Sequence, residues 1–331
     1  MSMNMKKTEF MVINGSAEDR CAILSDSLLV KHCDSYIYLG SPITADGLYS
    51  SVIQQHINEK MKHFIKYCTF VKKNEGFPFC IKKQVAYACL LASVLYGCET
   101  WLTNDFGKLE SLYMKIVKAL LGVRSTTCND LCLIEADMPP LKALIKKKRA
   151  CYFQSKLENL QDDDPLKFAW DLAKSVNTHS TRIIEDSLNS EISDIVDESF
   201  AATRNNINSS TSTKRVTYRQ LNTTLESPKI YAGRVPEYKR IQYTRFRLSS
   251  HRLRVETGRW LRTDREERVC DCVEGGVQDE HHALLTCAKT QDIRDKFGVS
   301  HDDLVSFFSD DSIEDADKAS IVYETVKVFD S

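Results

Sequence analysis

The chain has 331 residues, and its 45 lysines and arginines nearly balance 46 aspartates and glutamates, for a formal net charge of −1. This balance by itself favours no acidic or basic partner. A hydrophobic fraction of 42% and a charged fraction of 27% are ordinary for a globular protein. No apolar stretch reaches the ~18 residues of a membrane-spanning helix, and the polar start lacks the apolar core of a secretory signal peptide. We therefore expect an intracellular protein, nuclear or cytoplasmic, without a membrane partner.

The first 47 residues have the character of short strands separated by turns. β-branched and aromatic residues recur in EFMVIN and DSYIYLG, and Asn14-Gly15 is a turn signal between them. Pro42 and the pair Asp46-Gly47 end this region. The sequence predicts a small β domain over residues 1–47.

Residues 48–175 show the three- and four-residue spacing of apolar side chains that indicates helices. Gly97 and Gly122 follow two of these helices, where a left-handed residue commonly ends a helix. We predict a mainly α fold with a helical bundle here, its helices covering residues 50–68, 81–96, 105–121 and 142–160. Five cysteines lie among apolar residues and are predicted to be reduced core thiols: Cys68, Cys80, Cys89, Cys98 and Cys151.

Residues 176–228 differ in composition from the segments on either side. Ser, Asn and Thr dominate, glycine is absent, and apolar spacing is patchy except over residues 183–196. Such a composition is typical of a chain that does not build a core of its own. We predict a flexible, partly disordered linker that contains one weak helix.

The charge is distributed unevenly over the last hundred residues. Residues 229–268 hold twelve Lys or Arg against five Asp or Glu, a net charge of about +7. Residues 300–331 hold nine Asp or Glu against two Lys, so residues 301–331 are predicted to be an acidic tail.

The basic segment interleaves arginines with apolar and aromatic residues. The arginine fork matches phosphate geometry, and aromatic rings between basic residues can stack on unpaired bases. The alternative is a solvated charged face without a ligand. The candidate nucleic-acid-binding residues, for RNA or DNA, are Arg245, Arg247, Arg252, Arg254, Arg259, Trp260 and Arg262.

A group of cysteines and histidines follows, in VCDCVEGGVQDEHHALLTC. Structural zinc takes four nitrogen or sulfur donors in a tetrahedron, brought together by a short turn that Gly275-Gly276 would supply. On a helix beginning near Asp279, His282 would point at the same ion as a cysteine one turn later, whereas His281 would point elsewhere and is the weaker candidate. The alternative is a chance grouping in a cysteine-rich chain. We predict a zinc-knuckle-like module over residues 229–300, with a structural zinc ion held by Cys270, Cys272, His282 and Cys287.

Several phrases resemble one family, the non-LTR (LINE-type) retrotransposon reverse transcriptases. MNMKKTEFMVING resembles the Asn-x-x-Lys-Thr-Glu segment that closes the palm of these enzymes, and YIYLGSPITADG resembles the phrase that follows it. IKKQVAYACLLASVLYGCETW is similar to a helix of the family that ends on Tyr-Gly-x-Glu-x-Trp. The segments FRLSSHRLRVETGRWLRTDREERVCDC and DEHHALLTCAKTQDIRDKF are similar to the arginine-rich Cys-Cys-His-Cys tail. The phrases occur in the family's order and cover roughly residues 1–175 and 235–300.

The resemblance implies a palm remnant over residues 1–47, a thumb-like domain over 48–175 and a tail that handles nucleic acid. It places Lys6 or Lys7 near the incoming nucleotide, without a choice between them. The carboxylates that hold two metal ions in such polymerases precede the Lys-Thr-Glu segment, and the five residues before Lys6 include no acid. We therefore expect a truncated, retrotransposon-derived protein that binds nucleic acid and has no catalytic residue for polymerisation.

Two other interpretations stay open. The chain could be one segment of an active RNA-directed DNA polymerase whose catalytic part is missing here because of an incomplete gene model or splicing. It could also be a domesticated protein-interaction module, with the acidic tail covering the basic segment. Protein partners, oligomeric state and the preference for RNA or DNA are not indicated by the sequence.

Overall fold

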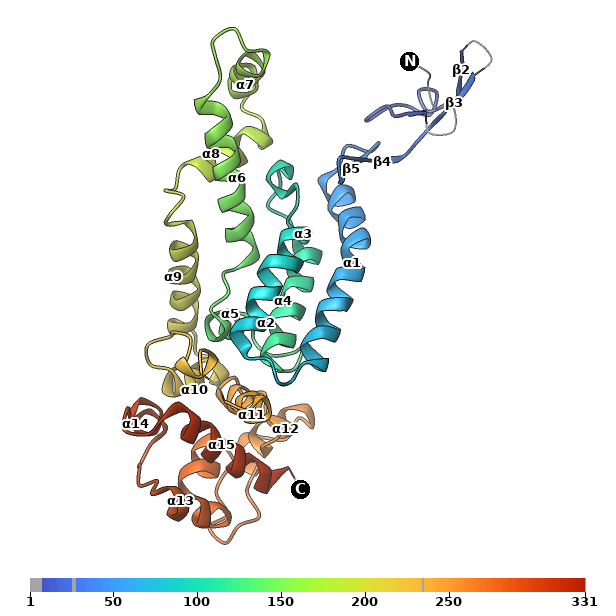
Figure 1. Cartoon of the computed structure of the whole chain (residues 1–331). Coiled ribbons are helices and arrows are strands. Elements are labelled where there is room, and N and C mark those ends of the chain that lie inside the picture. Colours follow the sequence, from blue (N-terminus) through green and yellow to red (C-terminus); the bar gives the residue numbers. More distant parts are fainter. Residues whose placement is uncertain (1–7, 26–27, 234, 331) are drawn as a thin grey trace. The chain divides into compact units, whose positions relative to one another are not determined.

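The computed structural model describes residues 8–25, 28–233 and 235–330 (Figure 1). The predicted Lys6 and Lys7 lie outside the described residues. The described fold is mainly helical with a small β part near the N-terminus, as the sequence predicts. No described helix combines the length and the apolar character that crossing a membrane would require.

The chain divides into two compact units, each assembled from separate segments. The first comprises the described residues of Met1–Lys66, Tyr87–Leu112 and Leu141–Ile195, and the second those of Tyr67–Ala86, Tyr113–Pro140 and Val196–Ser331. The sequence predicted consecutive domains instead. Apolar periodicity locates helices along the chain, but it does not indicate which distant helices share a core.

The strands of the first unit form two small sheets. In the three-stranded sheet the order is β1-β3-β2, with β1 parallel and β2 antiparallel to β3. The other two strands form an antiparallel hairpin. The predicted turn at Asn14 is present, since Asn14 adopts a φ of 58° and its N–H donates to the carbonyl of Ala45 at 2.8 Å. The strands are β1 (Glu9–Phe10), β2 (Ile23–Ser25), β3 (Leu28–His32), β4 (Ser35–Tyr38) and β5 (Ser41–Thr44).

Buried polar contacts fix the helical part of the first unit. His56 Nε2 lies 2.8 Å from the carbonyl of Val94, and its ring meets Trp101 edge-on at 5.0 Å. Arg149 donates to the carbonyls of Trp101 at 2.6 Å and Thr103 at 3.1 Å. The elements of this unit include α3 (Ala92–Val94), η2 (Cys98–Thr100), α6 (Leu141–Glu158), α7 (Pro165–Val176) and α8 (His179–Leu188).

Two long helices, α1 (Tyr49–Lys73) and α4 (Gly107–Leu121), contribute residues to both units. The predicted helix over residues 81–96 is divided into α2 (Phe79–Val85), the π-helix η1 (Ala86–Leu91) and α3. The predicted stops are confirmed, because Gly97 and Gly122 both adopt a φ of 74°. A β-carbon on Gly122 would also lie 2.8 Å from Ile241 Cγ1, so no other residue fits there without a shift.

The second unit is built mostly from the C-terminal helices, and α11 and α15 pack against each other in it. Phe246, Phe307, Ile321 and Val322 are among its fully buried side chains. The α-helices of this unit beyond α2 are α5 (Asn129–Ala136), α9 (Ile195–Asn208), α10 (Thr213–Leu221), α11 (Glu237–Arg247), α12 (Arg254–Trp260), α13 (Gln291–Phe297), α14 (Leu304–Ser309) and α15 (Asp315–Phe329). Its short π- and 3₁₀-helices are η3 (Lys229–Tyr231), η4 (Arg265–Glu267), η5 (His282–Thr286) and η6 (Ala288–Thr290).

A buried carboxylate organises the centre of this unit. Glu135 is 0% exposed and accepts two bonds from Arg247, at 2.8 and 3.2 Å. The hydroxyls of Tyr218 and Tyr231 donate to the same carboxylate at 2.8 and 3.0 Å. Burial would lower the pKa of Arg247, but Glu135 together with Tyr243 and Tyr218 raises this pKa well above the ordinary value. We call these four residues the Glu135 centre.

The predicted linker over residues 176–228 is mostly helical, so this prediction was wrong. It contains α8, α9 and α10, with Ile207 and Tyr218 fully buried. In α9 the residues Val196, Phe200, Thr203 and Ile207 follow each other at three- and four-residue steps. This stripe is sparse and contains a threonine, which is why a Ser- and Asn-rich composition concealed it.

The predicted acidic tail is a packed part of the fold. Residues 301–331 contain α14 and α15, and Ile321, Val322 and Val326 of α15 are buried. Its acids Asp315 and Asp317 lie in the first turn of α15, where the helix dipole favours negative charge. Charge counting alone missed the apolar face of this helix.

Of the five predicted core thiols only Cys98 is buried. Burial raises the pKa of this thiol to about 12. Cys68 and Cys80 are half-buried, and Cys89 and Cys151 are exposed. The cysteines stand among apolar residues in the sequence, but they lie on helix faces that neighbouring elements do not cover.

Candidate metal centre and basic surface

The first half of the cysteine–histidine cluster is a tight loop. Val269 and Val277 form an antiparallel bridge, and the N–H of Cys270 donates to the carbonyl of Gly276 at 2.7 Å. Gly275 adopts a φ of 63°, which favours glycine at this turn. The loop therefore holds Cys270 and Cys272 close together at its start.

The second half of the cluster is a short helical turn. Asp279 Oδ1 accepts the N–H of His282, the first residue of the π-helix η5, at 2.9 Å. The N–H of Cys287 donates to the carbonyl of His282 at 2.8 Å. These bonds place His282 and Cys287 at the two ends of one turn, as the sequence predicted.

The two halves bring four donor atoms together. The ligand atoms of Cys270, Cys272, His282 and Cys287 all lie within 4.8 Å of one another. Cys270 Sγ is 3.8 Å from Cys287 Sγ, and Cys272 Sγ is 3.3 Å from His282 Nε2. A disulfide would need about 2.05 Å between sulfurs, so these cysteines are free thiols.

Two of the donor separations are close to the edges of a tetrahedral zinc site. Zinc–sulfur bonds of about 2.3 Å and zinc–nitrogen bonds of about 2.0–2.1 Å imply a sulfur–sulfur edge of about 3.8 Å and a sulfur–nitrogen edge of about 3.6 Å. The first value matches the separation of Cys270 from Cys287, and the Cys272–His282 separation is a few tenths of an ångström shorter. Three thiols and one imidazole are also a donor set that zinc prefers.

Neighbouring groups support these donors as ligands. His282 Nδ1 lies 3.2 Å from Thr286 Oγ1, which orients the ring with Nε2 toward the cysteines. Gln278 Nε2 donates to Cys270 Sγ at 3.5 Å. Burial would raise the pKa of Cys270, but donors from Gln278 and Cys272 outweigh it and lower the pKa below its ordinary value. The cluster thus favours the thiolate form of Cys270, the form that binds metal.

The structure distinguishes between the two adjacent histidines. His281 Nε2 lies 3.0 Å from the carbonyl of Asp302, away from the thiols. His282 is the histidine of the cluster. This agrees with the preference for His282 drawn from helical spacing.

The predicted basic residues are divided between the surface and the interior. Arg252, Arg254, Trp260 and Arg262 are exposed, and Arg245 and Arg259 are half-buried. Arg247 is only 4% exposed because it belongs to the Glu135 centre. Arg245 and Arg247 lie on α11, and side chains two residues apart on a helix point about 200° apart. Arg247 therefore points into the interior, although the sequence pattern was interpreted as one basic stripe on the surface. Arg247 is not part of the nucleic-acid-binding surface that we predicted.

Several of the remaining arginines hold the module together. Arg254 donates to the carbonyl of Val269 at 2.5 Å and lies 3.8 Å from Asp271 in the cysteine loop. Arg259 pairs with Glu256 at 3.0 Å. Arg252 and Arg262 form no ion pair with a described residue. These two, with the exposed ring of Trp260, are the part of the predicted surface best placed for a ligand.

Sequence reasoning missed Arg124, which lies outside the basic segment. Its guanidinium lies 4.2 Å above the ring of Trp260. It donates to the carbonyl of His251 at 2.7 Å. Nothing in the sequence around Arg124 signals this position, because the contact joins the loop after α4 to residues more than a hundred positions later.

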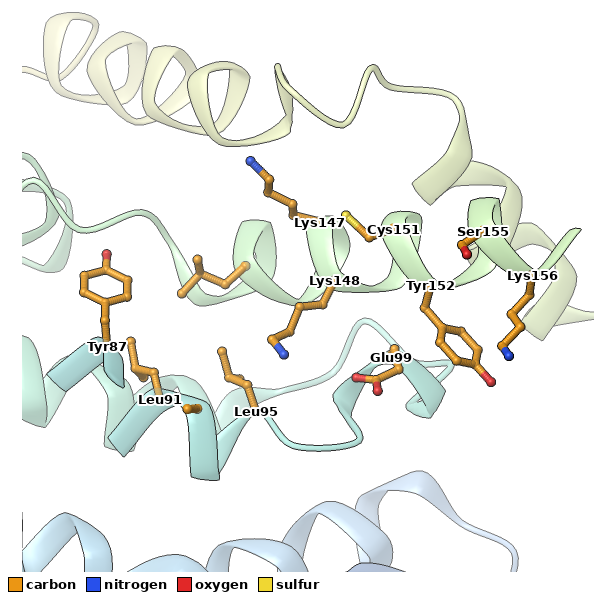
Figure 2. A pocket seen from close by; sticks show the side chains of 12 residues that line it. Tyr87, Leu91, Leu95, Glu99, Lys147, Lys148, Cys151, Tyr152, Ser155 and Lys156 are labelled. Atoms are coloured by element: carbon orange, nitrogen blue, oxygen red, sulfur yellow. The ribbon is translucent and has the colours of Figure 1, made fainter. Parts of the chain in front are cut away.

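The first unit has a cavity of about 700 Å³ that no predicted site residue lines. Its floor includes Leu91, Leu95 and Leu144, and lysines of α6 lie at its rim. Figure 2 shows Lys148 and Tyr152 directed from α6 toward the helix that carries Leu91 and Leu95. The cavity combines an apolar floor with a cationic rim.

Comparisons with protein-family models, with curated proteins and with solved structures found no match for this chain. The functional assignment therefore depends on the geometry of the cysteine–histidine cluster and the residues around it.

Proposed function

We propose that residues 229–300 form a zinc-stabilised module that binds nucleic acid, RNA or DNA. The observation that carries the proposal is the convergence of three thiols and one imidazole at separations that suit tetrahedral zinc. Four protein donors fill the coordination sphere, so the ion would be structural. Small zinc knuckles are a recurring kind of nucleic-acid-binding module.

The surface beside the cluster supports nucleic acid as the ligand. Arg252 and Arg262 are exposed cations without an ion pair among the described residues, and Trp260 offers an exposed ring. Cations contact phosphate, and aromatic rings stack on unpaired bases. Because arginines of the same segment also pack against the cysteine loop, the metal would fix the surface that meets the ligand.

The resemblance to non-LTR reverse transcriptases supports the same role. As part of the proposal, β1–β5 correspond to the end of a palm and the helices of residues 48–175 to a thumb. The proposed origin is a retrotransposon, and the proposed role of this chain is binding, without polymerase chemistry of its own. Its support is the order of four sequence phrases, from Lys-Thr-Glu to the cysteine–histidine cluster.

The metal assignment is tested by zinc stoichiometry on the full chain. Cys270→Ser and His282→Ala should each lower the bound zinc, measured by elemental analysis after dialysis. Their matched controls are Cys89→Ser, an exposed thiol outside the cluster, and His281→Ala, whose ring faces a carbonyl. Equal zinc content in all four variants would remove the metal from the proposal. Chelation should also unfold the module, because a structural site is coupled to folding.

The binding role is tested with labelled single-stranded oligonucleotides across a series of salt concentrations. Affinity should fall steeply with salt, since phosphate contacts release counterions. The double variant Arg252→Ala and Arg262→Ala should weaken binding across sequences. Arg182→Ala, an exposed arginine on α8, is the control for loss of charge. Salt-independent binding, or equal loss in the control, would contradict the proposal.

A second candidate, a protein-interaction module, is favoured by α7. No residue of this helix is buried, and Leu166, Phe168, Leu172 and Val176 are all exposed. Apolar faces of this kind are typical of interaction surfaces. Replacing Phe168 and Leu172 with Ser would abolish a protein complex and leave oligonucleotide binding unchanged.

The polymerase alternative has a direct assay as well. Under our proposal this chain with template, primer, Mg²⁺ and nucleotides gives no extension product. Primer extension that persists in the purified chain would replace the binding proposal with a catalytic one.

A further inference from the structure

A small cationic pocket lies in the second unit, and none of its lining residues is a metal donor. Its volume is about 360 Å³, at the lower end of the range for ligand sites. We call it the arginine pocket. It is lined by Arg124, Gln242, Arg245, Ser250, His251, Arg252 and Asp330.

The turn after α11 explains why these residues meet. Ser249 adopts a left-handed φ of 47°, and the N–H of Ser250 donates to the carbonyl of Arg245 at 2.7 Å. The chain therefore folds back on the end of α11 and brings Arg252 to the same pocket as Arg245. The Ser249 hydroxyl donates to Glu280 at 3.0 Å, which holds this uncommon conformation in place.

The end of α4 completes the pocket from the other side. Arg245 Nε donates to the carbonyl of Gly122 at 2.8 Å, and Arg124 follows two residues later. The C-termini of helices carry a partial negative charge, which stabilises cations near them. This favours the placement of the Arg245 guanidinium at the end of α4.

The arginines in this pocket exceed the acids that face them. Asp330 is the one acidic residue among the described lining residues. Burial lowers the pKa of Arg124 below its ordinary value; Glu256 and Asp330 oppose this shift, and the neighbouring Arg245 and Arg252 add to it. Arg252 is exposed and has no ion pair with a described residue. The pocket thus presents excess positive charge within a confined volume.

Ser250 adds a donor for an anion, whereas His251 is held by its neighbours. Ser250 Oγ accepts the N–H of Arg124 at 3.1 Å and the hydroxyl of Thr127 at 3.2 Å. Its own hydrogen is therefore left to donate. His251 Nδ1 accepts the N–H of Leu253 at 3.3 Å, so the ring proton is on Nε2, 2.9 Å from Glu280 Oε1. Glu280 directly precedes the histidine pair, so its bond to His251 connects the pocket with the segment that carries the metal donor His282.

From this geometry we infer that the arginine pocket binds one phosphate group of the nucleic-acid backbone. The guanidiniums of Arg124, Arg245 and Arg252 contact the phosphate oxygens. The carboxylate of Asp330 weakens phosphate binding because it neutralises part of the positive charge of the pocket. Trp260, which stacks with Arg124, lies where it can meet an adjacent base. The inference rests on the proposed function, and it adds the place and the residues of one phosphate contact.

The experiment compares matched pairs of variants in the full chain. Arg252→Gln should weaken binding of a single-stranded oligonucleotide about tenfold, as expected for a charge-assisted bond. It should also reduce the slope of log affinity against log salt by about 0.7, the value for one phosphate contact on a single strand. Arg262→Gln removes the same charge outside the pocket. Titration calorimetry should show that Arg262→Gln leaves the affinity for inorganic phosphate unchanged. Arg252→Gln should lower this affinity.

Asp330→Asn should increase binding affinity, a result that loss of the folded structure would not produce. It should tighten both oligonucleotide and phosphate binding several-fold, whereas Asp311→Asn, an exposed acid outside the pocket, should not. The inference is overturned if Asp330→Asn and Asp311→Asn behave alike, or if Arg252→Gln leaves phosphate affinity intact. Wild-type chain that binds inorganic phosphate but no oligonucleotide would assign the pocket to a free phosphate and overturn the proposed function instead.

Discussion

Two groups of arginines in the second unit differ in what faces them. In the Glu135 centre one guanidinium meets a carboxylate that also accepts two tyrosine hydroxyls. In the arginine pocket three guanidiniums face Asp330 alone among the described lining acids. Arg247 and Arg245 are two residues apart on α11, yet they belong to different groups. The comparison teaches that the balance of partners around an arginine, more than its place in a basic segment, separates a structural role from a binding role.

The largest effect should come from opening the Glu135 centre. Arg247→Met leaves a buried carboxylate without its cation, which costs about 3–5 kcal/mol of unfolding free energy. Arg252→Met removes an exposed arginine and should change stability by no more than about 0.5 kcal/mol. Urea denaturation of both variants measures the difference. Equal losses would show that the two groups do not differ as described.

A second prediction concerns the stability at high pH that depends on Tyr243, which packs against Arg247 of the Glu135 centre. The ring of Tyr243 lies 5.5 Å from the Arg247 guanidinium, and burial raises the pKa of Tyr243 to about 12. A raised pKa means that the folded state keeps this proton longer than the unfolded state. The associated stability is therefore fully present below about pH 10 and is lost as pH rises through 12, up to about 3 kcal/mol.

Tyr243→Phe removes this contribution, so the variant should lose less stability than the wild type between pH 9 and 11.5. Tyr238→Phe, on the exposed side of the same helix, is the control and should follow the wild type. Denaturant titrations at both pH values provide the measurement. Parallel curves for wild type and Tyr243→Phe would show that this hydroxyl does not titrate as described.

The smallest predicted effect on stability concerns Trp260, whose exposed ring contacts Arg124 of the arginine pocket. Trp260→Ala removes the ring beneath Arg124 and should cost about 0.5–1 kcal/mol of stability, the usual range for a cation–π contact near the surface. Its effect on oligonucleotide affinity should be larger, about 1–3 kcal/mol if a base stacks on the ring. A stability loss that exceeds the affinity loss would assign Trp260 to the fold.

The sequence predicted the elements better than their assembly. The strand region, the glycine stops at Gly97 and Gly122, and the four donors of the cluster were all found, because each depends on local spacing. The linker was wrong, since the helical stripe of α9 is too sparse to see against its polar composition. The acidic tail was wrong because charge counting did not register the buried Ile321 and Val322 of α15.

The candidate site was predicted in the same uneven way. His282 was preferred over His281 by helical spacing, and the structure brings His282 into the cluster. Arg247 was misplaced because the alternation of charged and apolar residues was read as a surface stripe, although the segment is a helix. Arg124 and Asp330 could not be found, since they follow α4 and α15, far in the sequence from most of the basic segment, and meet it only through tertiary packing.

The Glu135 centre also has a consequence for how this chain is made. Glu135 and Arg247 are separated by 112 residues, so on a ribosome that adds about 5–20 residues per second the arginine follows the glutamate by roughly 6–22 seconds. During that interval α5 has no partner for its carboxylate, and Tyr218 and Tyr231 arrive only shortly before Arg247. The second unit can therefore close only after Arg247 has been added. Lower growth temperatures or added chaperones should raise the yield of folded chain more than substitutions of surface residues do.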